Sequence, residues 1–310
     1  MENRFISIEA GGTKFVCAHG TNADDIQDRV VIPTKHPEET IPAIFQYIYK
    51  VAQKHTIAGI GLGIFGPIDL DPKSATHGFI TTTPKKAWQN FDMVGHFKHE
   101  FNLPVGFEVD VNASALGEHR WGSAQGLTDF IYVTVGTGIG GGAMVGGQLL
   151  HGALHAEMGH IMVPHLPEDE FAGVCGHHQD CLEGLASGPS MCKRWQVDSA
   201  LEIPEDHHAW EWEAQYLAYA MMNYTLCLSP QRIIIGGGVM RQDHLLDRIK
   251  IKTQAYLNEY IKHKNLTTEI DQYIVRPGLN ENSGICGGIA LAQNAWRQAQ
   301  QKSHAAIAAS

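Results

Sequence analysis

The spacing of apolar residues predicts that strands and helices alternate along most of the chain. Apolar residues between Glu38 and His55 recur at helical spacing, whereas Leu103–Val111 alternates apolar and polar residues as a strand does. An opening hairpin, strands at 57–65 and 130–150 and the strand-turn RIIIGGGVM complete the β elements, and the last residues, 303–310, are expected to form a frayed tail. The other expected helices lie at 89–101, 112–120, 211–229, 244–262 and 284–299. This alternation predicts an α/β protein.

Two segments of the sequence resemble each other. FISIEAGG at 5–12 and FIYVTVGT at 130–137 both run from Phe-Ile into a glycine-rich turn followed by another strand. So short a match can arise by chance. If it is not chance, it indicates two related lobes, each of which offers a turn to one cleft.

Composition narrows the class of protein. The 310 residues suggest about two domains, and 44% hydrophobic with 18% charged residues is typical of a globular protein. A formal net charge of −10 and the lack of any basic run argue against binding to nucleic acid. No apolar stretch of about twenty residues or leader pattern is present, so no membrane association is expected. Six scattered cysteines are typical of reduced thiols in a cytoplasmic protein.

Three glycine-rich turns are candidates for an anion site. They lie at 11–14, 136–142 and 236–238, each after a β run, and glycine lets backbone N–H groups approach a phosphate closely. The alternative is three ordinary hairpin or strand–helix turns. The P-loop pattern is absent. Gly136, Gly138 and Gly141 fit G-x-G-x-x-G, but a strand is expected after them where a dinucleotide fold needs a helix.

A loop at 155–185 contains the residue types of a zinc site. Two cysteines and a histidine are regularly spaced as Cys175-x-x-His178-x-x-Cys181, and His160 lies upstream. His177 is an alternative to His178, and a chance cluster among 18 histidines is the alternative to a metal site. Because protein would fill all four positions, the zinc is expected to be structural. It would rigidify the neighbouring carboxylates Glu157 and Glu183.

Two further carboxylates stand at the ends of predicted strands. Asp110 precedes the helix expected from Asn112, where α/β proteins often place chemistry, although an isolated Asp there is more often a helix N-cap. Glu9 stands directly before the first glycine turn, which is unexpected for a loop that would hold an anion.

Taken together, these motifs resemble the ROK family of sugar kinases and, within it, the bacterial fructokinase branch. The resemblance runs in family order over nearly the whole chain and implies an actin/hexokinase-like (ribonuclease H-like) fold of two α/β lobes with a zinc loop. The lobes are expected at 1–113 and 114–287, with the final helix, about 288–300, able to pack back on the first. The matching segments are EAGGTKF (9–15), FGPIDL (65–70), DVNASALGEHRWG (110–122), TVGTGIGGG (134–142), HAEMGH (155–160), CGHHQDCLEGLASGPS (175–190) and IIIGGGVM (233–240).

The resemblance implies roles for individual residues. Asp110 would be the general base that accepts the proton of the attacking sugar hydroxyl. Glu9 would hold the Mg²⁺ that accompanies ATP, directly or through water; the alternative is a solvent-facing strand end. His160 could bind zinc, sugar or both. The sugar side would comprise Gly66, Pro67, Asp110, Glu157, His160 and Glu183, and the ATP side Gly12, Thr13, Lys14, Thr137, Gly138, Pro189, Gly236, Gly237 and Gly238.

Departures from the family pattern favour fructose as the acceptor, phosphorylated at its 6-hydroxyl. Glucose- and N-acylmannosamine-specific members commonly have Asn before the catalytic Asp and Thr-Pro-Asn in a sugar loop, where this chain has Val109 and Thr83-Pro84-Lys85. Their zinc motif contains three cysteines, whereas this loop offers a second histidine. Mannose and glucose remain alternative acceptors. A repressor is disfavoured, because repressors of the family carry a DNA-binding segment before the core and this core starts at Phe5. A non-catalytic sugar-sensing regulator is disfavoured, because it would be expected to lack Asp110 or Lys14 and both are present. The resemblance also implies a homodimer.

Overall fold

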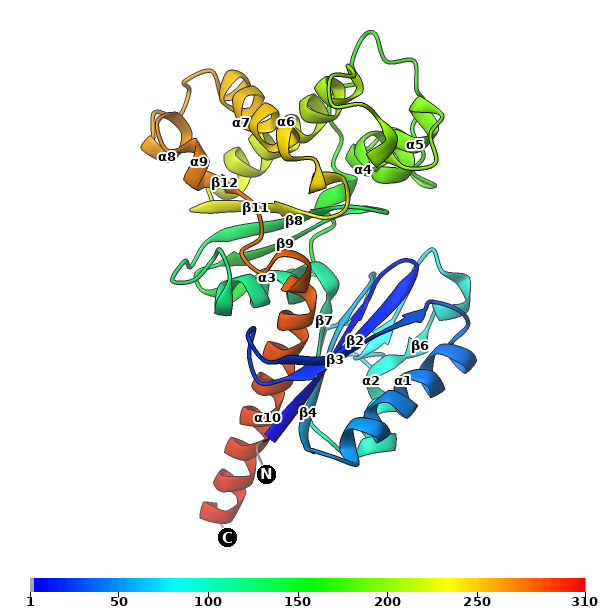
Figure 1. Ribbon diagram of the computed structural model, residues 1–310. Coiled ribbons are helices and arrows are strands. Elements are labelled where there is room, and N and C mark those ends of the chain that lie inside the picture. The colour runs from blue at the N-terminus through cyan, green and yellow to red at the C-terminus, as the bar shows by residue number, and fades with distance from the viewer. Residues whose placement is uncertain (1–2, 310) are drawn as a thin grey trace. The chain divides into compact units, whose positions relative to one another are not determined.

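Two five-stranded mixed sheets with the same strand order form the framework of the protein (Figure 1). The computed structural model describes residues 3–309, with side chains as far as Ala305. The first sheet contains β1 (Asn3–Ala10), β2 (Lys14–Gly20), β3 (Ile26–Pro33), β4 (Thr56–Ile64) and β7 (Val105–Val109), and the second contains β8 (Phe130–Val135), β9 (Ile139–Val145), β10 (Gln148–Leu149), β11 (Arg232–Gly236) and β12 (Ile274–Val275).

The two sheets share one topology. Their orders are β3-β2-β1-β4-β7 and β10-β9-β8-β11-β12, and in each an antiparallel hairpin pairs through its first strand with two successive parallel strands. The sequence echo at 5–12 and 130–137 falls on that first strand, β1 or β8. A third, two-stranded sheet pairs β5 (Phe79–Ile80) with β6 (Phe91–Asp92). The echo therefore reflects a repeated architecture.

The chain divides into two units that are not contiguous in sequence. The first unit comprises residues up to Gln125, His151–His155 and the residues from Glu281 onward; the second comprises Gly126–Leu150 and Ala156–Asn280. The expected boundary at 113/114 would cut helix α3 (Asp110–Trp121) in two. That helix packs along α10 (Ser283–Ala309) and stays whole in the first unit.

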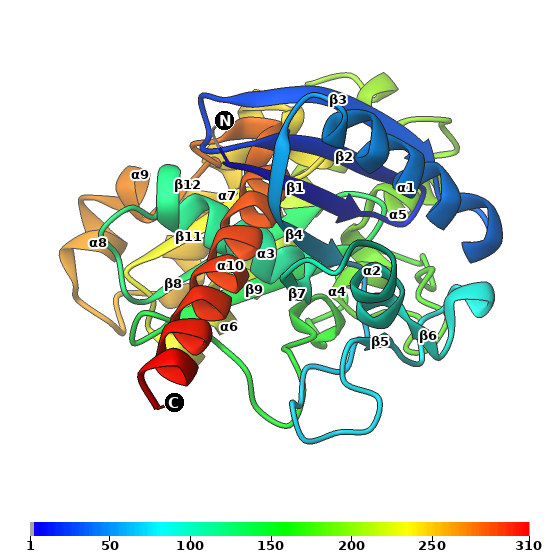
Figure 2. The same cartoon turned by 90° about the horizontal axis from the view of Figure 1, so that it is seen from below.

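In the first unit, helices cover both faces of the sheet. The helices α1 (Pro37–Ala52) and α2 (Met93–Phe101) pack on one face, and α3 and α10 pack on the other (Figure 2). Glycines in β4 allow α10 to approach closely, since a Cβ on Gly61 would lie 1.8 Å from the carbonyl oxygen of Gly288. The glycines that interrupt the apolar run at 57–65 are therefore explained by the close packing of α10 on β4.

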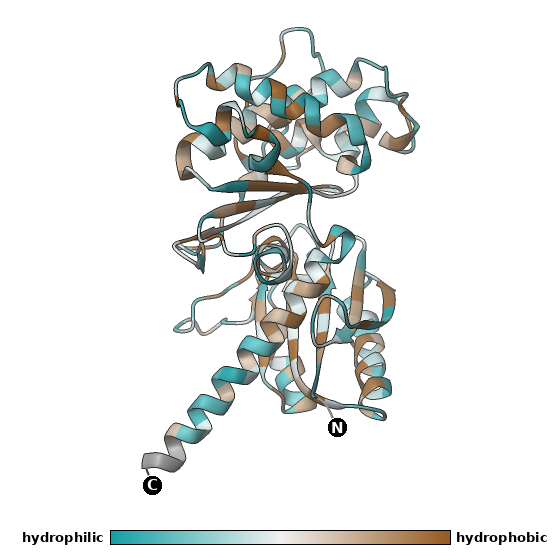
Figure 3. Cartoon of the chain, turned by 60° about the vertical axis from the view of Figure 1, so that its left-hand side comes forward, coloured by the Kyte–Doolittle hydropathy of each residue, from teal (hydrophilic) through white to brown (hydrophobic). Residues whose placement is uncertain are grey.

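In the second unit, one hydrophobic core joins the sheet to its helices. Ile131, Val133, Trp210 and Tyr216 are among its buried members. Figure 3 shows hydrophobic colours along the strands of both sheets and mostly hydrophilic colours on the distal turns of α10. The helices of this unit are α4 (Leu182–Ala186), α5 (Gly188–Trp195), α6 (Ala209–Leu228), α7 (Asp243–Leu257), α8 (Lys264–Thr267) and α9 (Ile270–Tyr273); the 3₁₀ turns of the chain are η1 (Lys86–Trp88), η2 (Met158–His160), η3 (Ala200–Glu202), η4 (Val239–Arg241) and η5 (Asn280–Asn282).

Several element boundaries differ from the sequence-based expectation. The expected frayed tail at 303–310 is wrong as far as Ala309, because α10 continues through this alanine-rich stretch, and alanine has the highest helix propensity; Ser310 lies outside the described residues. The helix expected at 244–262 ends at Leu257, where Asn258 adopts a left-handed conformation (φ 45°). Among the helices of residues 3–309, none is both long and apolar enough to span a bilayer.

Candidate functional site

The first glycine turn connects β1 to β2 and presents its residues to solvent. Its backbone is closed by a hydrogen bond from the N–H of Gly11 to the carbonyl of Lys14, 2.9 Å long. Gly12, Thr13 and Lys14 are exposed. The ammonium of Lys85 donates a hydrogen bond to the carbonyl of Gly12. Burial lowers the pKa of Lys85. Lys85 thus joins this turn, a contact that the sequence analysis did not predict.

Glu9 is held against the start of α10. A Cβ on Gly284 would lie 2.4 Å from the carboxyl carbon of Glu9, so glycine is required for this close approach. Burial raises the pKa of Glu9, while the charges of Arg29 and Lys14 act in the opposite direction. The side chain is half-buried, so it differs from the alternative of a solvent-facing strand end. A poorly solvated carboxylate is a chemically suitable ligand for Mg²⁺, which prefers oxygen donors.

Asp110 is the first residue of α3. The N-cap is Val109, so the helix begins two residues before the expected Asn112 and Asp110 is not the cap. One carboxylate oxygen, Oδ1, accepts a hydrogen bond of 2.9 Å from the N–H of Val111, and the side chain is half-buried. The positive end of the helix dipole favours the ionised carboxylate, the form that a general base requires.

Three strand ends bring Glu9, the Gly66-Pro67 turn and Asp110 to one edge of the first sheet. The register aligns Ala10 with Ile64 in the parallel pair β1/β4, and Ile64 with Val109 in the parallel pair β4/β7. The carboxyl ends of these strands therefore lie side by side, where open α/β sheets bind ligands. The carbonyl of Pro67 accepts hydrogen bonds from the N–H and the hydroxyl of Thr81, 2.8 and 3.0 Å long, which fix the turn.

In the second unit, three glycine segments converge. The carbonyl of Gly136 accepts a hydrogen bond of 2.8 Å from the N–H of Gly188, at the start of α5. Gly237 has φ +99°, and a Cβ there would lie 2.4 Å from the carbonyl oxygen of Val135. The strand β9 begins at Ile139, within the glycine-rich segment 136–142. A strand and not a helix therefore continues this segment, as expected, which excludes the dinucleotide fold. Of the residues assigned to the ATP side, this convergence holds Thr137, Gly138, Pro189, Gly236, Gly237 and Gly238.

The four predicted zinc ligands converge. One atom each from His160, Cys175, His178 and Cys181 lies within 4.8 Å of all the others. Nδ1 of His160 is 3.5 Å from Sγ of Cys181 and 3.7 Å from Sγ of Cys175, and Nδ1 of His178 is 3.7 Å from the latter sulfur. A tetrahedral zinc with Zn–S of about 2.3 Å and Zn–N of about 2.0 Å would separate these atoms by about 3.5 Å. The donor set therefore fits zinc, and His177 is not part of this group.

Glu183 connects the metal cluster to the second glycine turn. Its Oε2 accepts a hydrogen bond of 3.0 Å from the N–H of Ile139, and its Oε1 lies 4.0 Å from Nε2 of His160. The two ring nitrogens of His160 therefore face different groups: Nδ1 faces the sulfurs and Nε2 faces Glu183. Glu157 is exposed and immediately precedes η2, which ends at His160.

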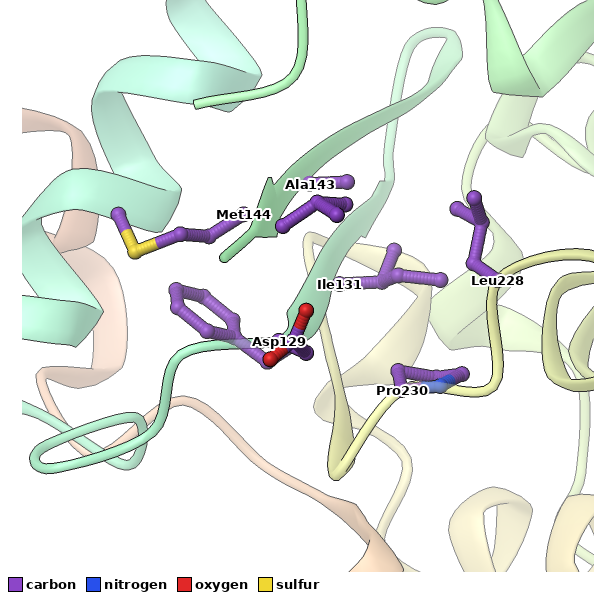
Figure 4. A pocket seen from close by; sticks show the side chains of 8 residues that line it. Asp129, Ile131, Ala143, Met144, Leu228 and Pro230 are labelled. Atoms are coloured by element: carbon purple, nitrogen blue, oxygen red, sulfur yellow. The ribbon is translucent and has the colours of Figure 1, made fainter. Parts of the chain in front are cut away.

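The predicted site residues thus form one group in each unit. The first unit holds Glu9, the turn at 12–14, Gly66, Pro67 and Asp110, and the second holds the remaining candidates. A shallow apolar depression on the second unit contains none of them (Figure 4). It is lined by Asp129, Phe130, Ile131, Ala143, Met144, Val145, Leu228 and Pro230.

Glu108 and His151 were missed by sequence reasoning. Glu108 lies in β7 with its side chain buried, and its carboxylate is 2.7 Å from Nε2 of His151. An acid within an otherwise apolar strand was a usable signal. The sequence offers no sign of its partner, 43 residues further along the chain.

Relatives match almost the full length of the chain. A sequence model of the ROK family matches residues 5–295. The fructokinase of Pediococcus pentosaceus is 43% identical over 94% of this chain and 99% of its own length. The fructokinase of Streptococcus mutans is 41% identical over 94% of this chain and 98% of its own length. A ROK family glucokinase from Streptomyces griseus, solved in complex with glucose and AMPPNP, is 25% identical over 94% of this chain and 99% of its own, with a TM-score of 0.73.

Proposed function

Because the chain belongs to the ROK family, we propose that it is an ATP-dependent hexose kinase whose acceptor is D-fructose, phosphorylated at the 6-hydroxyl. The observation that carries this proposal is the 41–43% identity to proteins named fructokinase, which extends through both units. The alignment of Glu9, the Gly66-Pro67 turn and Asp110 along one sheet edge supports it from the geometry.

In the proposed reaction, Asp110 accepts the proton of the attacking hydroxyl. Phosphoryl transfer depends mainly on positioning and charge neutralisation, so one well-placed carboxylate with suitable donors is sufficient. The N–H of Val111 donates to Oδ1 of Asp110 and so helps to orient the carboxylate that would accept the proton. The Gly66-Pro67 turn at the neighbouring strand end would position the sugar.

The glycine turns are the proposed contacts for ATP. Backbone N–H groups of Gly12 and Thr13, with the cation of Lys14, suit phosphate oxygens, and Thr137, Gly138, Pro189 and Gly236–Gly238 would contact the rest of the nucleotide. Glu9 would hold Mg²⁺, directly or through water, and that ion supplies neutralisation of phosphate charge when bound.

We further propose that the Cys₂His₂ cluster holds structural zinc. Bound zinc would fix the loop that carries Glu183 and the end of η2, and so place Glu157 and Glu183 toward sugar hydroxyls. The two nitrogens of His160 face different groups, which supports a dual role: Nδ1 on zinc and Nε2 near the sugar.

The decisive experiment is a coupled ADP-release assay with fructose, mannose and glucose at saturating MgATP. The proposal expects the largest kcat/KM with fructose. Turnover of glucose or mannose well above fructose would reassign the acceptor, and no turnover of any hexose would refute the kinase itself.

The setting of the enzyme is a separate proposal. All six cysteines are outside disulfides, which supports a location of the enzyme in the reducing cytoplasm.

The family resemblance supports a homodimer. Light scattering on the purified protein should give about twice the mass of one 34.0 kDa chain; a monomeric mass would contradict it.

A further inference from the structure

The segment His151–His155, here called the strap, belongs to the first unit although the chain on both sides of it belongs to the second. It is a tight turn: the N–H of Gly152 donates to the carbonyl of Leu154 over 3.0 Å, and the backbones of His151 and His155 form an antiparallel bridge. The strap therefore reaches the first unit with a histidine at each of its ends.

The first histidine is hydrogen-bonded to a buried carboxylate next to the proposed base. Glu108 is 3% exposed and lies two residues before Asp110. Its Oε2 is 2.7 Å from Nε2 of His151. Its Oε1 accepts hydrogen bonds from the N–H of Val109, 2.9 Å, and from the side-chain amide of Asn112, 3.1 Å.

These contacts surround the turn that presents Asp110. Val109 is the N-cap of α3 and Asn112 is its third residue, so the single carboxylate of Glu108 ties together both sides of the first helical turn. His151 holds that carboxylate from outside the turn. Its side chain is 41% exposed, so it can be replaced without opening a core cavity.

The second histidine is fixed to the other strand end. Nε2 of His155 accepts a hydrogen bond of 3.3 Å from the N–H of Ile68, directly after the Gly66-Pro67 turn, and the His155 side chain is buried. The strap thus contacts both first-unit segments that carry proposed acceptor contacts.

We propose that the strap organises the acceptor side of the first unit, and that His151 is a positioning residue that holds Asp110 in its catalytic orientation through Glu108. This inference rests on the proposed kinase function. Its physical basis is that a buried carboxylate with an unpaired oxygen would reorient or admit water, and the turn that it ties would loosen. A displacement of about 1 Å of a catalytic group can reduce the rate about 100-fold.

The test compares His151→Ala with His151→Gln. Gln keeps an N–H donor that can reach Oε2 of Glu108, whereas Ala removes the donor. We expect H151A to lower kcat by about 10- to 100-fold with KM for ATP near the wild-type value, and H151Q to stay within about threefold of wild type. His99→Ala, which removes an exposed histidine on α2, is the control and should leave kcat unchanged.

Two results would overturn the inference: wild-type kcat in H151A, or a loss in H151Q as large as in H151A. Should H151A fail to fold, H151N replaces it, because its side chain is one methylene shorter than that of Gln and does not reach Glu108. If the wild-type protein phosphorylates no hexose, the proposed function fails, and amide hydrogen exchange at Val109 and Val111 then tests the strap. Faster exchange in H151A than in H151Q supports the inference, and equal exchange refutes it.

Discussion

Replacing Asp110 by Asn would separate the chemistry of this carboxylate from its structural role. The side-chain oxygen of Asn can still accept the hydrogen bond from the N–H of Val111, and its size is the same. The substitution removes a negative charge from the first turn of α3, and the interaction of such a charge with the helix dipole contributes about 0.3–1 kcal/mol to the unfolding free energy. The unfolding free energy of D110N should therefore fall by no more than about 1 kcal/mol.

The effect of D110N on catalysis should be several times larger. General-base catalysis contributes about 10²–10⁴-fold, which corresponds to about 2.7–5.4 kcal/mol in the activation free energy at 1.36 kcal/mol for each factor of ten. The loss should fall on kcat, while KM for ATP stays near the wild-type value. The coupled ADP-release assay measures both, and thermal or urea unfolding measures stability.

Asp243→Asn provides a matched control. Asp243 is also the first residue of a helix, α7, and its side chain is fully exposed. D243N removes the same charge at the same helical position and should leave kcat unchanged. A folded D110N with kcat within about threefold of wild type would refute the general-base role, since it would lie below the range expected for such a group.

The remaining predictions concern the metal cluster and pH. Elemental analysis should find about one zinc per chain, and chelation or Cys175→Ser should lower the midpoint of thermal unfolding, while Cys227→Ser, at an exposed cysteine, should not; a metal-free protein of unchanged stability would exclude the site. The hydrogen bond to Glu108 raises the pKa of His151 above its ordinary value of 6.5. The contribution of protonated His151 to the unfolding free energy should therefore be complete below about pH 6.5 and be lost as the pH rises through the raised pKa of the folded state. The difference in unfolding free energy between wild type and H151Q should shrink from pH 5.5 to 8.5, and a constant difference would contradict this assignment.

Local patterns in the sequence were sufficient to predict most of the regular elements and the zinc cluster. The helix expected over Glu38–His55 corresponds to α1, which buries one face and carries helical periodicity. The strand expected at 57–65 corresponds to β4, which is buried on both faces along most of its length, as a continuous run of apolar residues and glycine indicates. The four metal ligands are close in sequence, and three of them share one loop. Such signals depend only on neighbouring residues.

Features set by distant contacts were not predicted. The edge strand β3 is mostly exposed along its length, so it shows no alternation to recognise. The pairing of Glu108 with His151 and the assignment of the strap to the first unit depend on how the chain returns to an element made much earlier. Family motifs supplied roles for Asp110 and the glycine turns that spacing alone left open.

The packing of α10 has a consequence for synthesis on the ribosome. Residues 283–292 of this helix are buried, against α3 and the strands β1 and β4. Until residues 283–292 emerge, this face of the first sheet is covered by α3 but not by α10, and apolar side chains that α10 buries, such as Phe5 and Val16, remain exposed. All residues of the second unit precede Glu281, so the first unit is the later of the two to have its residues available. This order differs from the usual N-to-C order in which domains become complete during synthesis, and it leaves the nascent first unit with transiently exposed apolar surface.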